Sequence, residues 1–250
     1  ERALIRARDR KGPVLVHVLT EKGRGYKPAQ EQRPKFHGIG PFEIETGKVK
    51  KSGEARPTFT EVFGETICEL AQTNRKIVAI TAAMKEGTGL NRFASEHPAR
   101  FFDVGIAEQH AVTMAAGMAR GGLKPFVAIY STFMQRAFDQ VVHDVALMNL
   151  PVVFCLDRAG LVGEDGPTHH GAFDISFLRA IPNLQFLAPA DEAELKKMLH
   201  YAAAATGPVA IRYPRGASAC SLESGQRHPL LQSGKAEVVK EGSQISVWAL

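Results

Sequence analysis

Six short apolar runs, separated by stretches with helical character, constrain the fold of this chain more than any other feature. Each run is continuous and rich in Val, Ile, Leu and Phe, without alternation between apolar and polar residues. Strands with this pattern are buried on both faces, as in a parallel sheet with helices on either side. We therefore predict an α/β fold with a doubly wound, mostly parallel sheet. The predicted strands are Ile77–Thr81, Phe101–Val104, Pro125–Ser131, Pro151–Arg158, Leu184–Pro189 and Pro208–Tyr213.

The helices between these runs have recognisable starts. Thr58 is followed by Glu61, and Asp191 by Glu194, which is the spacing of a capping box. In that motif the first side chain accepts a backbone N–H of the first turn, and the acid accepts the N–H of the cap. The predicted helices run from Thr58 to about Ala71 and over Gly89–Ser95, Ala107–Arg120, Gln135–Asn149 and Asp191–Ala205.

The two ends of the chain differ from this alternation. Pro13–Thr20 is continuous and β-branched, which predicts another buried strand, and residues 27–56 have the Pro- and Gly-rich composition of a linker. The chain opens without Met and stops inside a strand-like run, Ser243–Leu250. We therefore expect a fragment of a longer protein. Its parts would be the tail of one domain with a linker (1–56), the α/β domain (57–217), and a linker with the first strand of another domain (218–250).

Charge and cysteine content narrow the range of functions. The formal net charge is +5 over 250 residues without a run of Lys and Arg, which argues against nucleic acid or a membrane surface and favours small anionic substrates. No apolar run has the length of a membrane span, and no secretory signal is visible. The three cysteines are far apart, so we expect a reducing compartment and neither a disulfide framework nor a zinc site.

Polar and aromatic residues gather where the predicted strands end. Ligands of open α/β sheets bind beyond the carboxyl ends of the strands. A cluster of carboxylates, histidines, arginines and aromatics at that one edge therefore predicts an active site. Its members are Lys85, Glu86, Glu108, Tyr130, Phe133, Arg136, Asp157, Arg158, Asp165, His169, His170 and Arg215.

Glu108 stands out because it begins a helix made of small apolar residues. Such a helix packs closely against other backbone, so we expect the carboxylate to be at least partly buried. Burial is costly unless a cation or a hydrogen-bond donor meets the acid. The alternative is that Glu108 binds the free amides of the first helical turn.

Other members of the cluster also have structural interpretations. Phe133 fits a core aromatic as well as a ligand platform, and Arg136 fits a surface position on a helix. Asp165 lies in a glycine-flanked turn, where Asp is favoured for its local hydrogen bonds.

The histidines and the remaining arginines leave similar alternatives. His169 and His170 are adjacent, so their side chains diverge, which argues against a metal pair. Arg158 and Arg215 are either ordinary ion-pair partners or a grip for a phosphate or carboxylate, to which a planar guanidinium gives two-pronged contacts.

Most of the stretch from Pro13 to Gly216 resembles the 1-deoxy-D-xylulose-5-phosphate synthases, which are thiamine-diphosphate enzymes of the transketolase superfamily. The combination of Gly105–His110 with Asp157–Gly160 and Thr168–Asp174 separates that family from transketolase itself and from the β subunit of pyruvate dehydrogenase. The matching stretches are Glu21–Tyr26, Asp103–Val112, Tyr130–Gln140, Leu156–Asp174 and Tyr213–Gly216.

The resemblance implies a thiamine diphosphate site in which this chain supplies the pyrimidine-binding domain, residues 57–217. Glu108 matches the glutamate that hydrogen-bonds the aminopyrimidine ring, and Phe133 matches the aromatic that stacks on it. Lys22, Ile106 and Arg136 match positions near the cofactor.

It also implies an enzyme that condenses pyruvate with D-glyceraldehyde 3-phosphate, releasing CO2, to give 1-deoxy-D-xylulose 5-phosphate for non-mevalonate isoprenoid synthesis. His37 matches a residue of the reaction space, although a lone His in a linker is usually a surface residue. His169 and Asp165 match further residues of that space. Tyr130, Arg158 and Arg215, with Arg136, match the positions that grip the acceptor phosphate.

One departure limits the match: the Gly-Asp-Gly motif that holds the diphosphate and Mg2+ in this family is missing here. The resemblance then implies Mg2+ ligands in an absent amino-terminal domain, an isolated fragment without activity, a homodimer, and a bacterial cytoplasmic or plastid location. The alternatives are a transketolase or pyruvate dehydrogenase β-type subunit, or a non-catalytic dimerising subunit made of the pyrimidine domain alone.

Overall fold

The computed structural model describes residues 1–33, 35–49, 56–218, 238 and 241–245. The chain forms two compact units, Glu1–Glu54 and Ala55–Leu250. Among the described residues, no helix combines the length and apolar character needed to cross a membrane.

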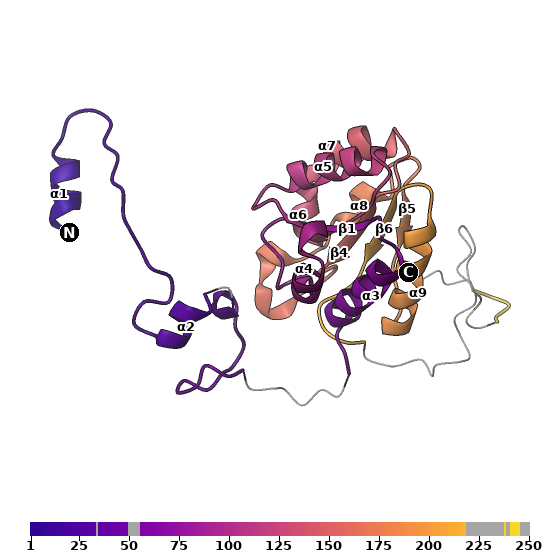
Figure 1. Ribbon diagram of the computed structural model, residues 1–250, viewed down its shortest axis with the longest axis horizontal. Coiled ribbons are helices and arrows are strands. Elements are labelled where there is room, and N and C mark those ends of the chain that lie inside the picture. The colour runs from indigo at the N-terminus through magenta and orange to yellow at the C-terminus, as the bar shows by residue number, and fades with distance from the viewer. Residues whose placement is uncertain (34, 50–55, 219–237, 239–240, 246–250) are drawn as a thin grey trace. The chain divides into compact units, whose positions relative to one another are not determined.

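A parallel sheet forms the centre of the larger unit (Figure 1). Within the described residues it has six strands in the order β2-β1-β3-β4-β6-β5. All six predicted strands are confirmed, and so is the doubly wound α/β fold. The strands are β1 (Ile77–Thr81), β2 (Phe101–Asp103), β3 (Lys124–Tyr130), β4 (Val153–Asp157), β5 (Gln185–Leu187) and β6 (Val209–Arg212).

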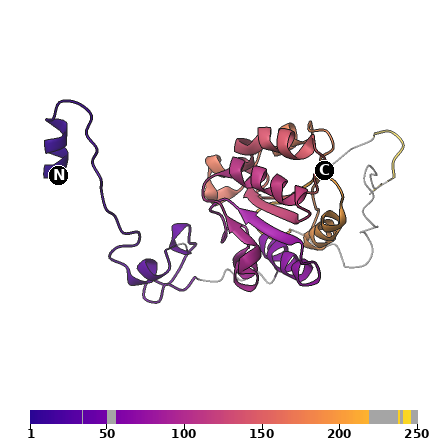
Figure 2. The ribbon, with the colours of Figure 1, turned by 45° about the horizontal axis from the view of Figure 1, so that its top comes forward.

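Helices cover both faces of this sheet, as Figures 1 and 2 show. One face buries the apolar side of α3 (Phe59–Thr73), with Phe63 and Ile67, against β1, β3 and α9 (Glu192–Ala204). The other face buries Ala111, Val112 and Ala115 of α5 (Glu108–Arg120), whose small side chains let the helix lie close to the strands. The helices on the first face are α3 (Phe59–Thr73), α4 (Asn91–Glu96) and α9 (Glu192–Ala204), and those on the second include α5 (Glu108–Arg120) and α8 (Asp174–Leu178).

The predicted helix starts form largely as expected. The Thr58 hydroxyl accepts the N–H of Glu61 at 3.2 Å, and the Glu61 carboxylate accepts the N–H of Thr58 at 2.7 Å, which confirms the first capping box. Asp191 accepts the N–H of Glu194 at 2.8 Å. The Glu194 carboxylate accepts the N–H of Ala190, one residue before the cap, at 2.7 Å.

The predicted helix Gln135–Asn149 is wrong in its form. Helical structure starts earlier, directly after β3, and is broken into pieces. Its buried residues are Met134, Ala137, Val141, Val145 and Ala146. The pieces are α6 (Ser131–Met134), the 3-10 turn η3 (Gln135–Ala137), α7 (Phe138–Gln140) and the π-helical turn η4 (Val141–Ala146).

The smaller unit differs from its prediction at the expected strand Pro13–Thr20. These residues have no regular structure, and Leu15 and Leu19 are 93% and 85% exposed. A buried strand needs partner strands on both edges. Within the described part of the chain, no strand pairs with this segment.

The described part of the predicted linker is also folded. It contains α2 (Lys27–Glu31), the short turn η1 (Lys35–His37) and an antiparallel bridge between Phe42 and Val49. The rings of Tyr26, Phe36 and Phe42 pack together with centroids 5.4 to 6.0 Å apart. This aromatic cluster explains the order, because three rings bury apolar area that a linker lacks. Residues 246–250 of the predicted strand Ser243–Leu250 lie outside the described residues.

Candidate active site

The strand order changes direction at β1. The chain leaves β1 for β2 on one side, and β3 lies on the other side of β1. Open α/β sheets bind ligands where the connections diverge in this way, at the carboxyl ends of the strands. Tyr130 ends β3 opposite Asp157, which ends β4. The predicted clustering of polar residues at this edge is confirmed by the contacts described below.

Glu108 is buried and meets a cation, as predicted. Its side chain is 2% exposed, and Nη1 of Arg136 donates to its Oε1 at 2.6 Å. No first-turn amide donates to this carboxylate among the hydrogen bonds of the described residues, so the alternative interpretation fails. The second oxygen, Oε2, is buried without a hydrogen-bond partner in that part of the chain. The Arg136 side chain remains 48% exposed.

An aromatic group lies beside this ion pair. The ring of Phe133, on α6, stacks with Tyr130 at a centroid distance of 5.8 Å and an angle of 15°. His169 meets the edge of both rings, at 5.4 Å from Phe133 and 6.4 Å from Tyr130. The Arg136 guanidinium lies 4.9 Å from the Phe133 centroid. Phe133 is only partly buried, so the ring borders the site rather than filling the core.

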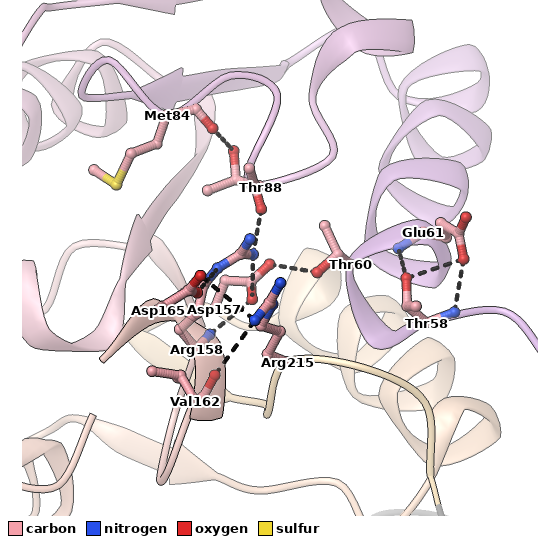
Figure 3. Close-up of polar contacts among 11 residues, drawn as sticks. Thr58, Thr60, Glu61, Met84, Thr88, Asp157, Arg158, Val162, Asp165 and Arg215 are labelled. Atoms are coloured by element: carbon pink, nitrogen blue, oxygen red, sulfur yellow. Dashed lines mark hydrogen bonds and ion pairs between the residues drawn. The ribbon is translucent and has the colours of Figure 1, made fainter. Parts of the chain in front are cut away.

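Arg158 is fixed from several sides just after β4, as Figure 3 shows. Its Nη1 donates to the carbonyl of Gly87 and to Oδ1 of Asp157, the latter at 3.0 Å. Its guanidinium carbon lies 4.2 Å from the centroid of Tyr130, a cation–π distance. The backbone φ of Arg158 is +60°, a left-handed conformation that costs energy for a residue other than glycine.

Asp165 connects the two arginines that end neighbouring strands. Its carboxylate oxygens lie 3.7 Å from Nε of Arg158 and 3.4 Å from Nη1 of Arg215. Nη1 of Arg215 also donates to the carbonyl of Val162 at 3.4 Å. Figure 3 shows both guanidinium groups turned toward this acid. Guanidinium groups bind carboxylate and phosphate oxygens with the same two-pronged geometry, so this pair of arginines has the chemistry of an anion site.

Burial shifts the titration of two groups at this edge. Burial raises the pKa of Asp157 above its usual range, although the Arg158 guanidinium and the Thr60 hydroxyl oppose this shift. Burial also raises the pKa of Tyr130, against the attraction of Arg158. The Tyr130 phenol is therefore a neutral hydrogen-bonding group at physiological pH.

Contacts link eight of the predicted site residues in one continuous series: Glu108, Arg136, Phe133, Tyr130, His169, Arg158, Asp165 and Arg215. Ile106 is not part of it, since its side chain is 79% exposed. Lys22 and His37 belong to the smaller unit, where Nζ of Lys22 lies 2.6 Å from Nδ1 of His37. Their roles stay predictions.

The sequence analysis missed three residues at this edge. Gly87 lies so close to the Tyr130 hydroxyl that a Cβ there would overlap it. Ser131 has a buried hydroxyl without a partner among the described residues, beneath Gly171. The Thr60 hydroxyl donates to Oδ2 of Asp157 at 2.7 Å. The glycine after β1 was a usable signal of close approach. Thr60 gave none, because it precedes Asp157 by 97 positions.

The described residues contain no group of three or more His, Cys, Asp and Glu arranged to hold a metal ion. His170 illustrates the alternative use of these side chains. Its Nδ1 accepts the N–H of Val162 at 3.1 Å and so stabilises the loop that carries Asp165.

Sequence comparisons identify a family and several relatives. A family model described as transketolase, pyrimidine binding domain, matches residues 55–219. The 1-deoxy-D-xylulose-5-phosphate synthase of Natranaerobius thermophilus is 58% identical over 96% of this chain. That of Pelotomaculum thermopropionicum is 57% identical over 98% of it. The chain spans 38% of the length of each of these relatives.

The solved structures that are similar to this chain include two transketolases. A split-gene transketolase, described as an inactive β4 tetramer, is similar with a TM-score of 0.61 and 32% identity, covering 69% of this chain and 56% of that one. A transketolase from Campylobacter jejuni has a TM-score of 0.60 at 22% identity, over 79% of this chain and 31% of that one. The second likeness shows a shared fold.

Proposed function

The chain belongs to the family of transketolase pyrimidine-binding domains, and from this premise we propose that it forms the pyrimidine half of a thiamine diphosphate site. The longer protein would be a 1-deoxy-D-xylulose-5-phosphate synthase, a transferase that joins pyruvate to D-glyceraldehyde 3-phosphate with loss of CO2. The identity to named synthases over nearly the whole chain supports this substrate pair.

The free oxygen of Glu108 is the observation that carries the proposal. A buried acceptor without a partner costs about 1–3 kcal/mol, so it persists where a ligand supplies the partner. Arg136 holds the other oxygen, so Oε2 is the atom that would accept a hydrogen bond from the cofactor's pyrimidine ring. Phe133 presents a partly buried ring beside this pair for stacking. The donor set therefore fits the cofactor. When bound, thiamine diphosphate supplies a carbon that becomes nucleophilic on losing its proton.

The second part of the site suits the acceptor. Arg158 and Arg215 provide two guanidinium groups for the phosphate of glyceraldehyde 3-phosphate, with the neutral Tyr130 phenol beside them. His169 and Asp165 lie between these arginines and Phe133, where they orient the substrates or move a proton. Lys22, His37 and Ile106 are assigned to the same site by the resemblance alone.

Three further proposals concern the longer protein. Mg2+ and the diphosphate group bind through residues outside this chain, since the relatives are much longer. The protein acts as a homodimer and shows no affinity for nucleic acid or membranes. It works in the bacterial cytoplasm, or in a plastid if a transit peptide precedes this chain.

Glu108→Ala in the longer protein tests the central assignment. We expect turnover of pyruvate and glyceraldehyde 3-phosphate to fall by about 100-fold or more, with an unchanged circular dichroism spectrum. Glu96→Ala is the matched control, because Glu96 forms an exposed pair with Arg92. Unchanged turnover in Glu108→Ala would remove this acid from the reaction. Turnover of a ketose donor without release of CO2 would instead identify a transketolase.

A further inference from the structure

We propose that Asp157 is a positioning residue: together with Thr60 it fixes the Arg158 guanidinium so that one nitrogen, Nη2, is left to bind an anion. This inference rests on the proposed phosphate-binding role of Arg158. It assigns a task to two residues that the resemblance leaves without one, and it connects the start of α3 to the acceptor side of the site.

The first observation is that both oxygens of Asp157 are occupied. The residue is fully buried. Its Oδ1 accepts the backbone N–H of Arg158 at 2.7 Å and Nη1 of the same residue at 3.0 Å. Its Oδ2 accepts the Thr60 hydroxyl at 2.7 Å. Asp157 has no exposed surface for a ligand, so its carboxylate acts through Arg158.

The second observation is the use of the Arg158 guanidinium. Nη1 binds Asp157 and the Gly87 carbonyl, and the face of the group lies on the Tyr130 ring. Nε is buried and makes no hydrogen bond, with Asp165 at 3.7 Å. Among the hydrogen bonds of the described residues none involves Nη2. Because Nε is buried and faces Asp165, Nη2 is the nitrogen that an approaching phosphate oxygen finds.

The third observation is that Thr60 supplies the hydrogen bond to the second oxygen of Asp157. A hydroxyl has a single proton to donate, and Thr60 uses it on Oδ2. Figure 3 shows Thr60 reaching from α3 toward Asp157, while Arg158 lies on the other side of the acid. Without this bond the Asp157 carboxylate is held only through Oδ1, by the two hydrogen bonds from Arg158 itself.

Fixing an arginine before the ligand arrives increases affinity. An unrestrained side chain loses rotamer freedom on binding, and its immobilisation weakens binding by up to about 10-fold. We therefore expect loss of the Thr60 hydroxyl to weaken phosphate binding by several-fold, up to about 10-fold, and loss of the Asp157 charge to weaken it more.

The test measures binding of sn-glycerol 3-phosphate to the longer protein by calorimetry, because this ligand carries the phosphate without a reactive aldehyde. The variants are Asp157→Asn, Thr60→Val and Thr60→Ser. Thr66→Val is the matched control, since Thr66 is another buried threonine of α3. We expect weaker binding in the first two, recovery in Thr60→Ser, and wild-type affinity in Thr66→Val. Thiamine diphosphate affinity should stay unchanged in Thr60→Val, which separates positioning from general damage to the fold.

The outcomes separate this inference from the proposed function. Wild-type affinity for glycerol 3-phosphate in Thr60→Val and Asp157→Asn would overturn the positioning role and leave the phosphate site standing. Equal loss in Thr60→Val and Thr66→Val would also overturn it, as a packing effect. No binding by the wild type, or undiminished binding by Arg158→Ala, would reject the phosphate role and the inference with it. If Asp157→Asn does not fold, the comparison of Thr60→Val with Thr60→Ser tests the positioning role.

Discussion

Two buried carboxylates at the same edge of the sheet, Glu108 and Asp157, each meet an arginine but use it differently. One oxygen of Glu108 accepts a hydrogen bond from Arg136, whose side chain is 48% exposed. The other oxygen has no partner among the described residues. Both oxygens of Asp157 accept hydrogen bonds, one from Arg158 and the other from the Thr60 hydroxyl. The Arg158 side chain is 14% exposed. Burial and ion pairing are common to both acids.

The difference between them is spare hydrogen-bonding capacity. Asp174 repeats the closed pattern, because Oδ1 accepts the N–H of Ile175 and Oδ2 accepts Nε of Arg212. Acids of this kind stabilise the fold, because all their hydrogen bonds are made within the protein. An acid that is buried with one oxygen unused is the exception, and that is where a ligand completes the hydrogen bonding. Spare capacity, rather than burial, is therefore the ground on which we propose that Glu108 contacts the cofactor.

The largest expected effects come from making both acids neutral. Glu108→Gln should lower turnover of the longer protein by about 100-fold or more while changing the free energy of unfolding by less than about 1 kcal/mol. Asp157→Asn should lower the free energy of unfolding by about 3 kcal/mol, because it removes the nearer of the two carboxylates that pair with the largely buried Arg158 side chain. Urea denaturation of this chain measures both stabilities. Equal stability losses would erase the distinction between the two acids.

A smaller effect is expected from Gly87→Ala. The added methyl group would enter the space of the Tyr130 hydroxyl and disturb the carbonyl that binds Arg158. We expect a loss of about 1–3 kcal/mol in the free energy of unfolding. Gly117→Ala on α5 is the control, since nothing lies within 4 Å of a Cβ there. That substitution should stabilise the chain by about 0.5–1 kcal/mol. Similar losses in both variants would contradict the close packing of the loop after β1.

The smallest effect concerns a buried cation at the opposite end of β3. Nζ of Lys124 donates to the Ala205 carbonyl at 2.8 Å, and burial lowers the pKa of this amine from 10.5 to about 8. Between these values the unfolded chain binds more protons than the folded one, so stability rises with pH. The slope should reach at most about 1.4 kcal/mol per pH unit.

Lys124→Met should remove this slope. Urea denaturation at several pH values between 8 and 10.5 measures it, with the exposed Lys196→Met as control. An identical slope in wild type and Lys124→Met would show that burial of this charge leaves stability unaffected, and would weaken the reasoning applied to the acids.

The sheet and its polar edge were predictable because they depend on local pattern. Continuous apolar runs such as Ile77–Thr81 identify buried strands, and parallel strands bring their carboxyl ends to one edge. The burial of Glu108 followed from the small residues around it. Its ion pair with Arg136 was not predicted, because the sequence alone also fits Arg136 to a surface position on a helix.

Contacts between residues far apart in the sequence, and irregular local structure, were not predictable. The Thr60–Asp157 bond joins residues 97 positions apart, and no periodicity marks it. The π-helical turn at Val141–Ala146 has no counterpart in the sequence pattern, which predicts one continuous helix. Pro13–Thr20 has the composition of a buried strand, yet composition says nothing about whether partner strands are available.

The proton at C2 of thiamine diphosphate gives the most direct test of the central claim, that Glu108 tunes the cofactor through its free oxygen. Exchange of this proton with deuterium, bound to the longer protein, is followed by acid quenching and proton NMR. We predict that Glu108→Gln slows the exchange by about 100-fold or more, and that Glu96→Gln leaves it unchanged. An unchanged exchange rate in Glu108→Gln, with the cofactor still bound, would contradict the claim.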